Sequence, residues 1–232
     1  MKFDGEKLYQ VFGKYRFSTP LGVCRCPSCV GPETEKALLS TSLRKMPASL
    51  LSEFTNSAHG KGKPEDLKYL LPRYFELWAE GIPTSHIGME MSSTPLENSD
   101  WENWNEDESN AVATGLKQLF LDSLEEETPL GKIPLETVLV MLSVARAPLA
   151  SWILEIIPRA SKVQCARLGS LAEAIQGDSF ADPFWSLRNK SGREIRQALS
   201  SSPVLEKFME VLSQAERPDL NAQIESAFHQ FA

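Results

Sequence analysis

The sequence predicts an all-α fold, an irregular bundle of about ten helices. Leu occurs 29 times, against 10 Val and 9 Ile, and Leu favours helices whereas β-branched residues favour strands. No stretch alternates apolar and polar residues cleanly over five or more positions, as a half-buried strand would. Apolar residues recur instead at helical spacing, and the prolines near the expected helix starts follow no fixed period. We therefore expect a bundle without a regular repeat.

The first 81 residues are expected to form an N-terminal part of several helices and a Cys-containing loop. Segments 3–15, 47–58 and 64–80 carry apolar residues at helical spacing, and Pro32 suits the first position of a further helix. The clearest apolar face lies in 64–80, where we expect these side chains in the core: Leu67, Leu70, Leu71, Tyr74, Phe75 and Trp78. Pro72 inside this segment predicts a kink or a break, and Gly81 its end.

Residues 82–99 contain two Pro and four Ser and show little helical spacing. They predict the longest loop and a boundary between the N-terminal part and a C-terminal part, 100–232, the two packing as one globular unit. A long helix is expected over 100–127. Further helices are expected near 134–146, 149–157, 161–176, 183–199, 204–215 and 218–231.

Three short motifs in the first 80 residues resemble those of a family of uncharacterised bacterial proteins. The motifs are Cys-Pro-Ser-Cys at 26–29, Leu-Arg-Lys-Met at 43–46, and an Asp-x-Lys-x-x-Leu-Pro-Arg helix that begins at Asp66. The resemblance implies a helical protein. It implies no activity, because none is known for the family, and the second half of the chain resembles nothing we can name.

Composition and charge exclude several classes of protein. Acids at positions 4 and 6, without an apolar run of signal-peptide length, argue against a secretory signal. The most apolar stretch, 133–157, contains charges and a proline, so it predicts core helices and no membrane span. The net charge of −7 argues against a nucleic-acid partner, since phosphate binding needs clustered Lys and Arg. We expect a cytoplasmic protein.

Cys24, Cys26 and Cys29 raise the alternative of a zinc site. A structural zinc takes four ligands in a tetrahedron, and a Cys-x-x-Cys turn supplies two of them. A second pair of this kind is missing, and the other His and Cys residues of the chain are scattered. The simpler interpretation is a turn whose thiols behave as small apolar groups.

Acidic residues are concentrated in one segment. Residues 100–127 contain nine acids and one base, a net charge of −8, whereas 1–99 carry +1 and 128–232 carry 0. Glu125, Glu126 and Glu127 would stand at the C-terminal end of the expected helix, where the dipole disfavours anions. A solvated face would explain these charges; a docking surface for a basic protein is the functional alternative. Its candidate residues are Glu106, Asp107, Glu108, Asp122, Glu125, Glu126, Glu127, Trp101 and Trp104.

The function that this pattern predicts is binding of a basic protein without catalysis. No Gly-x-Ser-x-Gly element is present and there are only three His, so we nominate no catalytic residue. The sharpest form is an immunity protein, an inhibitor of a cationic toxin such as a nuclease, since acidic inhibitors associate fast with basic clefts. The alternatives are a zinc-stabilised regulatory module around the Cys loop, and an enzyme with an unrecognised helical active site.

Overall fold

The computed structural model describes residues 3–24, 29–57, 63–176, 179–180 and 183–232, and its fold is all-α as predicted. The described α-helices are α1 (Glu6–Phe12), α2 (Pro32–Ser40), α3 (Ala48–Ser57), α4 (Pro64–Ala79), α5 (Thr94–Glu97), α6 (Glu106–Ser123), α7 (Leu135–Val144), α8 (Leu149–Ile156), α9 (Lys162–Gly169), α10 (Asn189–Leu199), α11 (Ser202–Leu212) and α12 (Asn221–Phe231). Short 3-10 helices are η1 (Leu43–Lys45), η2 (Trp101–Asn103), η3 (Leu130–Lys132), η4 (Ile157–Arg159), η5 (Ser170–Ala172), η6 (Pro183–Arg188) and η7 (Pro218–Leu220). The strands β1 (Ile175–Gln176) and β2 (Ser179–Phe180) pair antiparallel, with Ile175 opposite Phe180.

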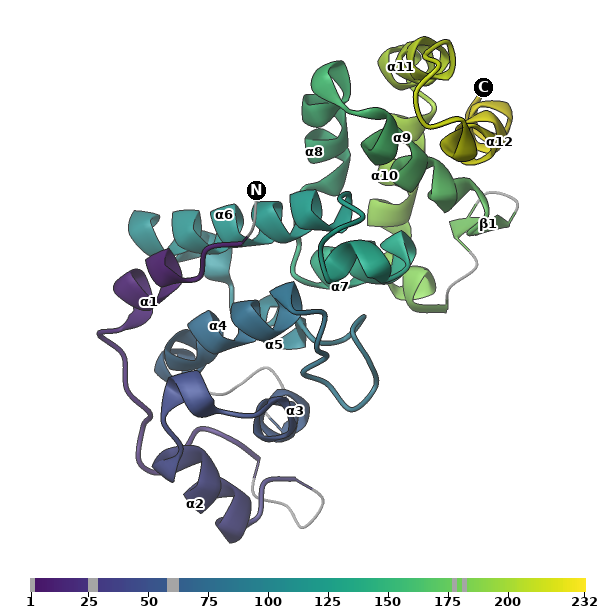
Figure 1. Cartoon of the computed structure of the whole chain (residues 1–232). Coiled ribbons are helices and arrows are strands. Elements are labelled where there is room, and N and C mark those ends of the chain that lie inside the picture. The colour runs from purple at the N-terminus through teal and green to yellow at the C-terminus, as the bar shows by residue number, and fades with distance from the viewer. Residues whose placement is uncertain (1–2, 25–28, 58–62, 177–178, 181–182) are drawn as a thin grey trace.

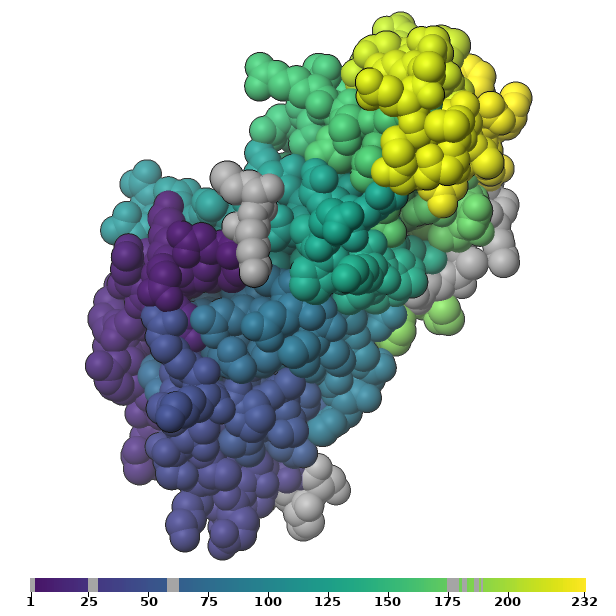
Figure 2. Space-filling model, in the orientation of Figure 1, coloured from purple at the N-terminus to yellow at the C-terminus, as the bar shows by residue number. Residues whose placement is uncertain are grey.

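The helices are arranged along an elongated molecule roughly in the order of the sequence (Figure 1). Helices α1 to α5 form one end, and α8 to α12 form the other. Helix α6 contacts α1, α4 and α7, so it joins the two ends. The space-filling view shows the same progression, from the purple N-terminal end to the yellow C-terminal end (Figure 2).

Helix α4 buries the apolar face that its sequence predicts. Leu70, Leu71, Tyr74 and Phe75 have no exposed surface, and Trp78 is almost fully buried. Pro72 does not break the helix, which is continuous from Pro64 to Ala79. Its neighbours on the apolar face are held in the core, and this packing offsets the backbone hydrogen bond that a proline cannot donate.

The helix end at Gly81 is also confirmed. Gly81 has φ +71°, a left-handed conformation that a residue without Cβ adopts at little cost. Its N–H donates to the carbonyl of Trp78, and the N–H of Ile82 donates to that of Leu77. The C-terminal carbonyls of α4 are thereby satisfied.

The long helix expected over 100–127 is wrong at both ends. The chain first forms η2, and α6 begins only at Glu106, because the Asn105 side chain caps it by accepting a hydrogen bond from the Glu108 N–H. The helix ends at Ser123, whose carbonyl accepts hydrogen bonds from the Arg167 guanidinium at 3.1 Å. The three consecutive Glu residues at 125–127 therefore follow the helix and do not form its last turn.

The segment 82–99 is packed into the molecule and contains α5. Thr84, Ser92 and Ser93 are buried. The Trp78 indole donates to the Thr84 hydroxyl at 2.9 Å, and the Ser93 hydroxyl donates to the Met141 carbonyl. The segment therefore connects α4 to α7 through side-chain hydrogen bonds.

The expected C-terminal helices are present with changed bounds. The predicted helix 161–176 is divided into α9, η5 and strand β1, and residues 183–188 are 3-10 helix ahead of α10. Within the described part of the chain, no helix has both the length and the apolar character needed to cross a bilayer.

Candidate functional site

Asp66, the first residue of the Asp-x-Lys-x-x-Leu-Pro-Arg pattern, is fully buried in the first turn of α4. Its carboxylate accepts three hydrogen bonds from the segment 18–22. The donors are the N–H of Ser18 at 2.6 Å, the hydroxyl of Ser18 at 2.8 Å and the N–H of Gly22 at 2.9 Å. Asp66 therefore fixes the chain between α1 and α2 against the start of α4.

Lys68, two residues later, pairs with Glu108, a carboxylate with no exposed surface. Lys68 Nζ lies 2.7 Å and Lys14 Nζ 2.8 Å from the Glu108 oxygens, and the Tyr15 hydroxyl donates to the same group. Burial alone would raise the pKa of the Glu108 carboxyl, but these hydrogen bonds outweigh it and lower the pKa to about 2. This cluster ties the α1 region, α4 and α6 together.

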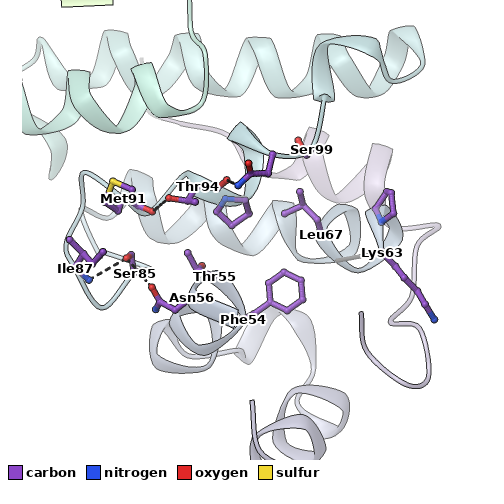
Figure 3. Close-up of a pocket in the computed structure, with 13 residues that line it drawn as sticks. Phe54, Thr55, Asn56, Lys63, Leu67, Ser85, Ile87, Met91, Thr94 and Ser99 are labelled. Atoms are coloured by element: carbon purple, nitrogen blue, oxygen red, sulfur yellow. Dashed lines mark hydrogen bonds between the residues drawn. The ribbon is translucent and has the colours of Figure 1, made fainter. Parts of the chain in front are cut away.

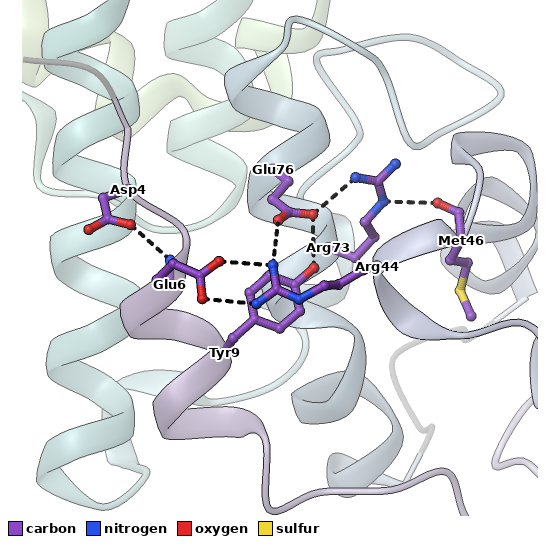
Figure 4. Close-up of polar contacts among 7 residues, drawn as sticks. All are labelled: Asp4, Glu6, Tyr9, Arg44, Met46, Arg73 and Glu76. Atoms are coloured by element: carbon purple, nitrogen blue, oxygen red, sulfur yellow. Dashed lines mark hydrogen bonds and ion pairs between the residues drawn. The ribbon is translucent and has the colours of Figure 1, made fainter.

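Arg73, the last residue of the pattern, bonds Met46 of another segment and Glu76 of its own helix (Figure 4). Its Nε donates to the Met46 carbonyl at 2.9 Å, and its Nη1 lies 3.0 Å from Glu76 Oε2. The same Glu76 oxygen accepts a hydrogen bond from the Tyr9 hydroxyl at 2.8 Å. Burial of the phenol and the neighbouring Glu76 carboxylate raise the pKa of Tyr9, so Tyr9 is a phenol that holds α1 against α4.

Arg44 completes this group from η1. Its guanidinium stacks 3.7 Å above the Tyr9 ring and donates twice to Glu6, at 2.9 Å each (Figure 4). Bidentate pairing and stacking are the geometries that a guanidinium favours. The three charged residues of the Asp-x-Lys-x-x-Leu-Pro-Arg pattern thus each bond a different neighbouring segment. These bonds stabilise the packing of the N-terminal part. The resemblance to the bacterial family stays a prediction.

Three residues of the predicted docking surface are buried, which corrects their assignment. Glu108 faces Lys14 and Lys68, as described. Asp122 accepts hydrogen bonds from the Phe3 N–H at 3.1 Å and the Gln118 amide at 2.8 Å. Burial raises the pKa of Asp122, and these two hydrogen bonds partly counter that rise.

Trp101 is the third buried member, and its indole donates to the Ala145 carbonyl at 3.0 Å. Trp104 is partly buried, donates to the Ser99 carbonyl and packs edge-on against Phe12. The two indoles therefore serve the packing of η2 and do not form an exposed aromatic anchor.

The three Glu residues after α6 differ in their surroundings. Glu125 accepts a hydrogen bond from the Gln164 amide at 2.8 Å, and Glu126 pairs with Arg217 at 3.2 Å. Glu127 is exposed. Two of the three carboxylates are therefore used within the molecule, which weakens the argument that they are kept for a partner.

Four of the acids that remain exposed in 100–127 are grouped where the chain enters α6, whereas Glu126 and Glu127 follow its other end. Asp100, Glu102, Glu106 and Asp107 are all exposed and fall within eight residues; we call them the entrance patch. Glu102 pairs with Arg146 at 3.3 Å. Among described residues, Glu106 and Asp107 form no ion pair.

The predicted zinc ligands cannot be assembled from the described residues. Cys24 and Cys29 are partly exposed, whereas Cys26 lies outside the described part of the chain. Within that part, no group of three or more His, Cys, Asp or Glu side chains is placed to hold a metal ion. The zinc alternative stays a prediction.

A pocket of about 300 Å³ lies beside α4, and no sequence pattern predicts it (Figure 3). Helix α3 forms one side, the start of α4 another, and the segment 85–99 the third. Its lining residues are Phe54, Thr55, Asn56, Lys63, Pro64, Leu67, Ser85, Ile87, Met91, Thr94, Pro95, Asn98 and Ser99. The Ser- and Pro-rich composition of 82–99 predicts a loop. That part of this segment lines a cavity is seen only in the folded structure.

The chain was compared with protein-family models, with curated proteins and with solved structures, and no match was found.

Proposed function

We propose that the chain is a non-enzymatic cytoplasmic protein that binds a basic protein partner, and that the entrance patch is the contact surface. The observation that carries the proposal is the exposure of four carboxylates within residues 100–107, in a chain whose segments 1–99 and 128–232 have net charges of +1 and 0. Burial removes Glu108, Asp122 and Trp101 from the surface proposed from the sequence. It leaves a smaller surface at one end of α6.

The local electrostatics favour a cationic partner. The N-terminus of α6 contributes roughly half a positive charge, and Arg146 offsets the charge of Glu102. Asp100, Glu106 and Asp107 then remain as negative charge open to solvent. Exposed charge of one sign steers an oppositely charged protein and raises its association rate.

The sharpest form of this function is an immunity protein that covers the cationic cleft of a toxin such as a nuclease. A cleft that binds phosphate carries clustered Lys and Arg, and an acidic patch is complementary to it. The same patch would repel nucleic acid, so the protein would bind the enzyme and not its substrate.

Zero-length carbodiimide coupling in lysate of the native host tests the contact directly. This reagent joins a carboxylate to a lysine amine that touches it, and peptide mass spectrometry identifies both residues. We expect coupling at Asp100, Glu106 or Asp107 to one basic protein. Coupling confined to acids outside 100–107 would contradict the proposal.

Binding kinetics with the purified partner supply the second test. Glu106→Gln/Asp107→Asn should slow association several-fold at low salt, and the difference should shrink as salt screens exposed charge. Glu216→Gln/Glu225→Gln is the matched control, because it removes the same charge from two exposed acids elsewhere. Equal rates for parent and both variants would show that the patch is not the contact surface.

A further inference from the structure

We propose that the pocket between α3, α4 and the segment 85–99 binds a small, largely apolar molecule that carries N–H or O–H donors and no positive charge. This site is separate from the protein-binding function proposed above. Its volume of about 300 Å³ is at the lower end of the range for small-molecule sites. It is about twice the volume of an engineered cavity that accepts benzene.

The apolar part of the lining spans the pocket. Phe54, Leu67 and Pro95 are buried in its walls. Ile87 and Met91 lie at one end and Lys63 at the other (Figure 3). Ile87 is 62% exposed. A bound molecule would cover part of this surface, and burial of apolar area supplies the affinity.

The two hydroxyls of the polar lining present acceptors because their donors are already used. The Thr94 hydroxyl donates to the Met91 carbonyl at 2.7 Å, and the Ser99 hydroxyl donates to the Leu96 carbonyl at 2.8 Å. A hydroxyl has one donor and two lone pairs. No described residue donates to either of these oxygens, so both can accept a hydrogen bond from a ligand.

Asn98 adds a third acceptor. Its amide nitrogen donates to the Thr94 carbonyl at 3.4 Å, which leaves the side-chain oxygen open. Three acceptors around an apolar cavity select a molecule with donors.

The charge of the lining selects against cations. Lys63 is the single charged residue among the lining residues, and no carboxylate is among them. The Lys63 ammonium lies at the edge of the pocket, where it donates to the Pro20 carbonyl at 3.3 Å (Figure 3). A neutral molecule is therefore accepted, an anionic group is favoured near Lys63, and an ammonium is repelled.

Indole and benzofuran are matched probes for this site. They have nearly the same size and shape, but indole has an N–H donor where benzofuran has an oxygen. The methyl signals of protein labelled with ¹³C-methyl methionine report the place of binding. Met91 lines the pocket, and Met209, exposed on α11, serves as the distant reference.

We expect indole to shift the Met91 signal and leave that of Met209 unchanged. Benzofuran should bind about three- to tenfold more weakly, which is the effect of one hydrogen bond. Indole-3-propionate should bind more tightly than tryptamine, and Lys63→Gln should reduce that preference. No shift of Met91 with indole, or equal affinities within both pairs of probes, would overturn the proposal.

Thr94→Val/Ser99→Ala removes two of the acceptors. The preference for indole over benzofuran should then shrink to what the Asn98 oxygen alone supplies, whereas the control Thr114→Val, an exposed hydroxyl on α6, should keep the full difference. Unchanged discrimination in the double variant would contradict the assigned acceptors. If circular dichroism shows that the double variant is unfolded, the proposal is tested by the affinities of the two probe pairs for the parent protein. These probes involve no protein partner. A negative result with them would therefore leave the protein contact proposed at the entrance patch untouched.

Discussion

Replacing Glu108 by Gln should destabilise the fold by about 3 kcal/mol at pH 7. The folded protein holds the pKa of this carboxyl at about 2, against 4.5 for the free group. A difference of about 2.5 units, at 1.36 kcal/mol per unit, corresponds to about 3 kcal/mol of stability. The variant also leaves Lys68, whose side chain is largely buried, without its carboxylate.

The pH dependence follows from the direction of this shift. Because the folded pKa is lowered, the carboxylate stabilises the fold fully above about pH 4.5, and this contribution is lost as the pH falls towards 2. At pH 3 it should amount to about 1 kcal/mol. The difference in unfolding free energy between parent and Glu108→Gln should therefore shrink from about 3 to about 1 kcal/mol between pH 7 and pH 3.

Urea denaturation of both proteins at the two pH values measures this difference. Glu106→Gln is the matched control, since it removes an exposed acid from the same turn of α6. Its unfolding free energy should fall only by the ~0.3–1 kcal/mol of a helix-dipole interaction. Glu108→Gln/Lys68→Met should recover part of the loss by removing the unpaired cation. An equal difference in unfolding free energy between parent and Glu108→Gln at pH 7 and pH 3 would contradict a lowered pKa of Glu108 as its source.

Three further predictions concern the packing of α4 and α6. Asp66→Asn should cost about 1–3 kcal/mol in urea denaturation and speed proteolysis within 18–22, because the amide cannot accept all three hydrogen bonds; unchanged cleavage there would contradict it. Leu71→Ala, at a site with no exposed surface, should cost about 2–5 kcal/mol, and an unchanged melting temperature would show that the site is not core. Gly115→Ala should cost about 1–3 kcal/mol, because its Cβ would lie 2.7 Å from the Phe75 ring; a stabilised variant would show that the ring moves freely.

The sequence predicted the fold class and most helices because these depend on local pattern. The apolar stripe of α4 and its end at Gly81 are properties of neighbouring residues, and both are confirmed. The start of α6 was missed although Asn105 is a cap signal followed by three acids, Glu106, Asp107 and Glu108. Its end depends on Arg167, which is 44 residues from the carbonyl that it binds.

The candidate surface was less predictable, because charge along a sequence does not reveal burial. Glu106 and Glu108 are two residues apart, yet the first is exposed and the second has no exposed surface. The difference arises from Lys14 and Lys68, which reach Glu108 from other segments. The pocket beside α4 was unpredictable for the same reason, since its walls come from segments that only the fold brings together.

The bonds that hold the N-terminal segment have a consequence for synthesis on the ribosome. Tyr15 bonds Glu108 and Phe3 bonds Asp122, partners that follow 93 and 119 residues later in the chain. At a synthesis rate of about 5–20 residues per second, Asp122 is made roughly 6 to 24 s after Phe3. Helix α1 is made before both of its neighbours. Its bond to Glu76 of α4 can form earlier, but its contacts towards α6, such as that of Phe12 with Trp104, wait until those later residues are made. A pause in translation before residue 108 would prolong the interval in which a chaperone or a protease can act on the nascent chain.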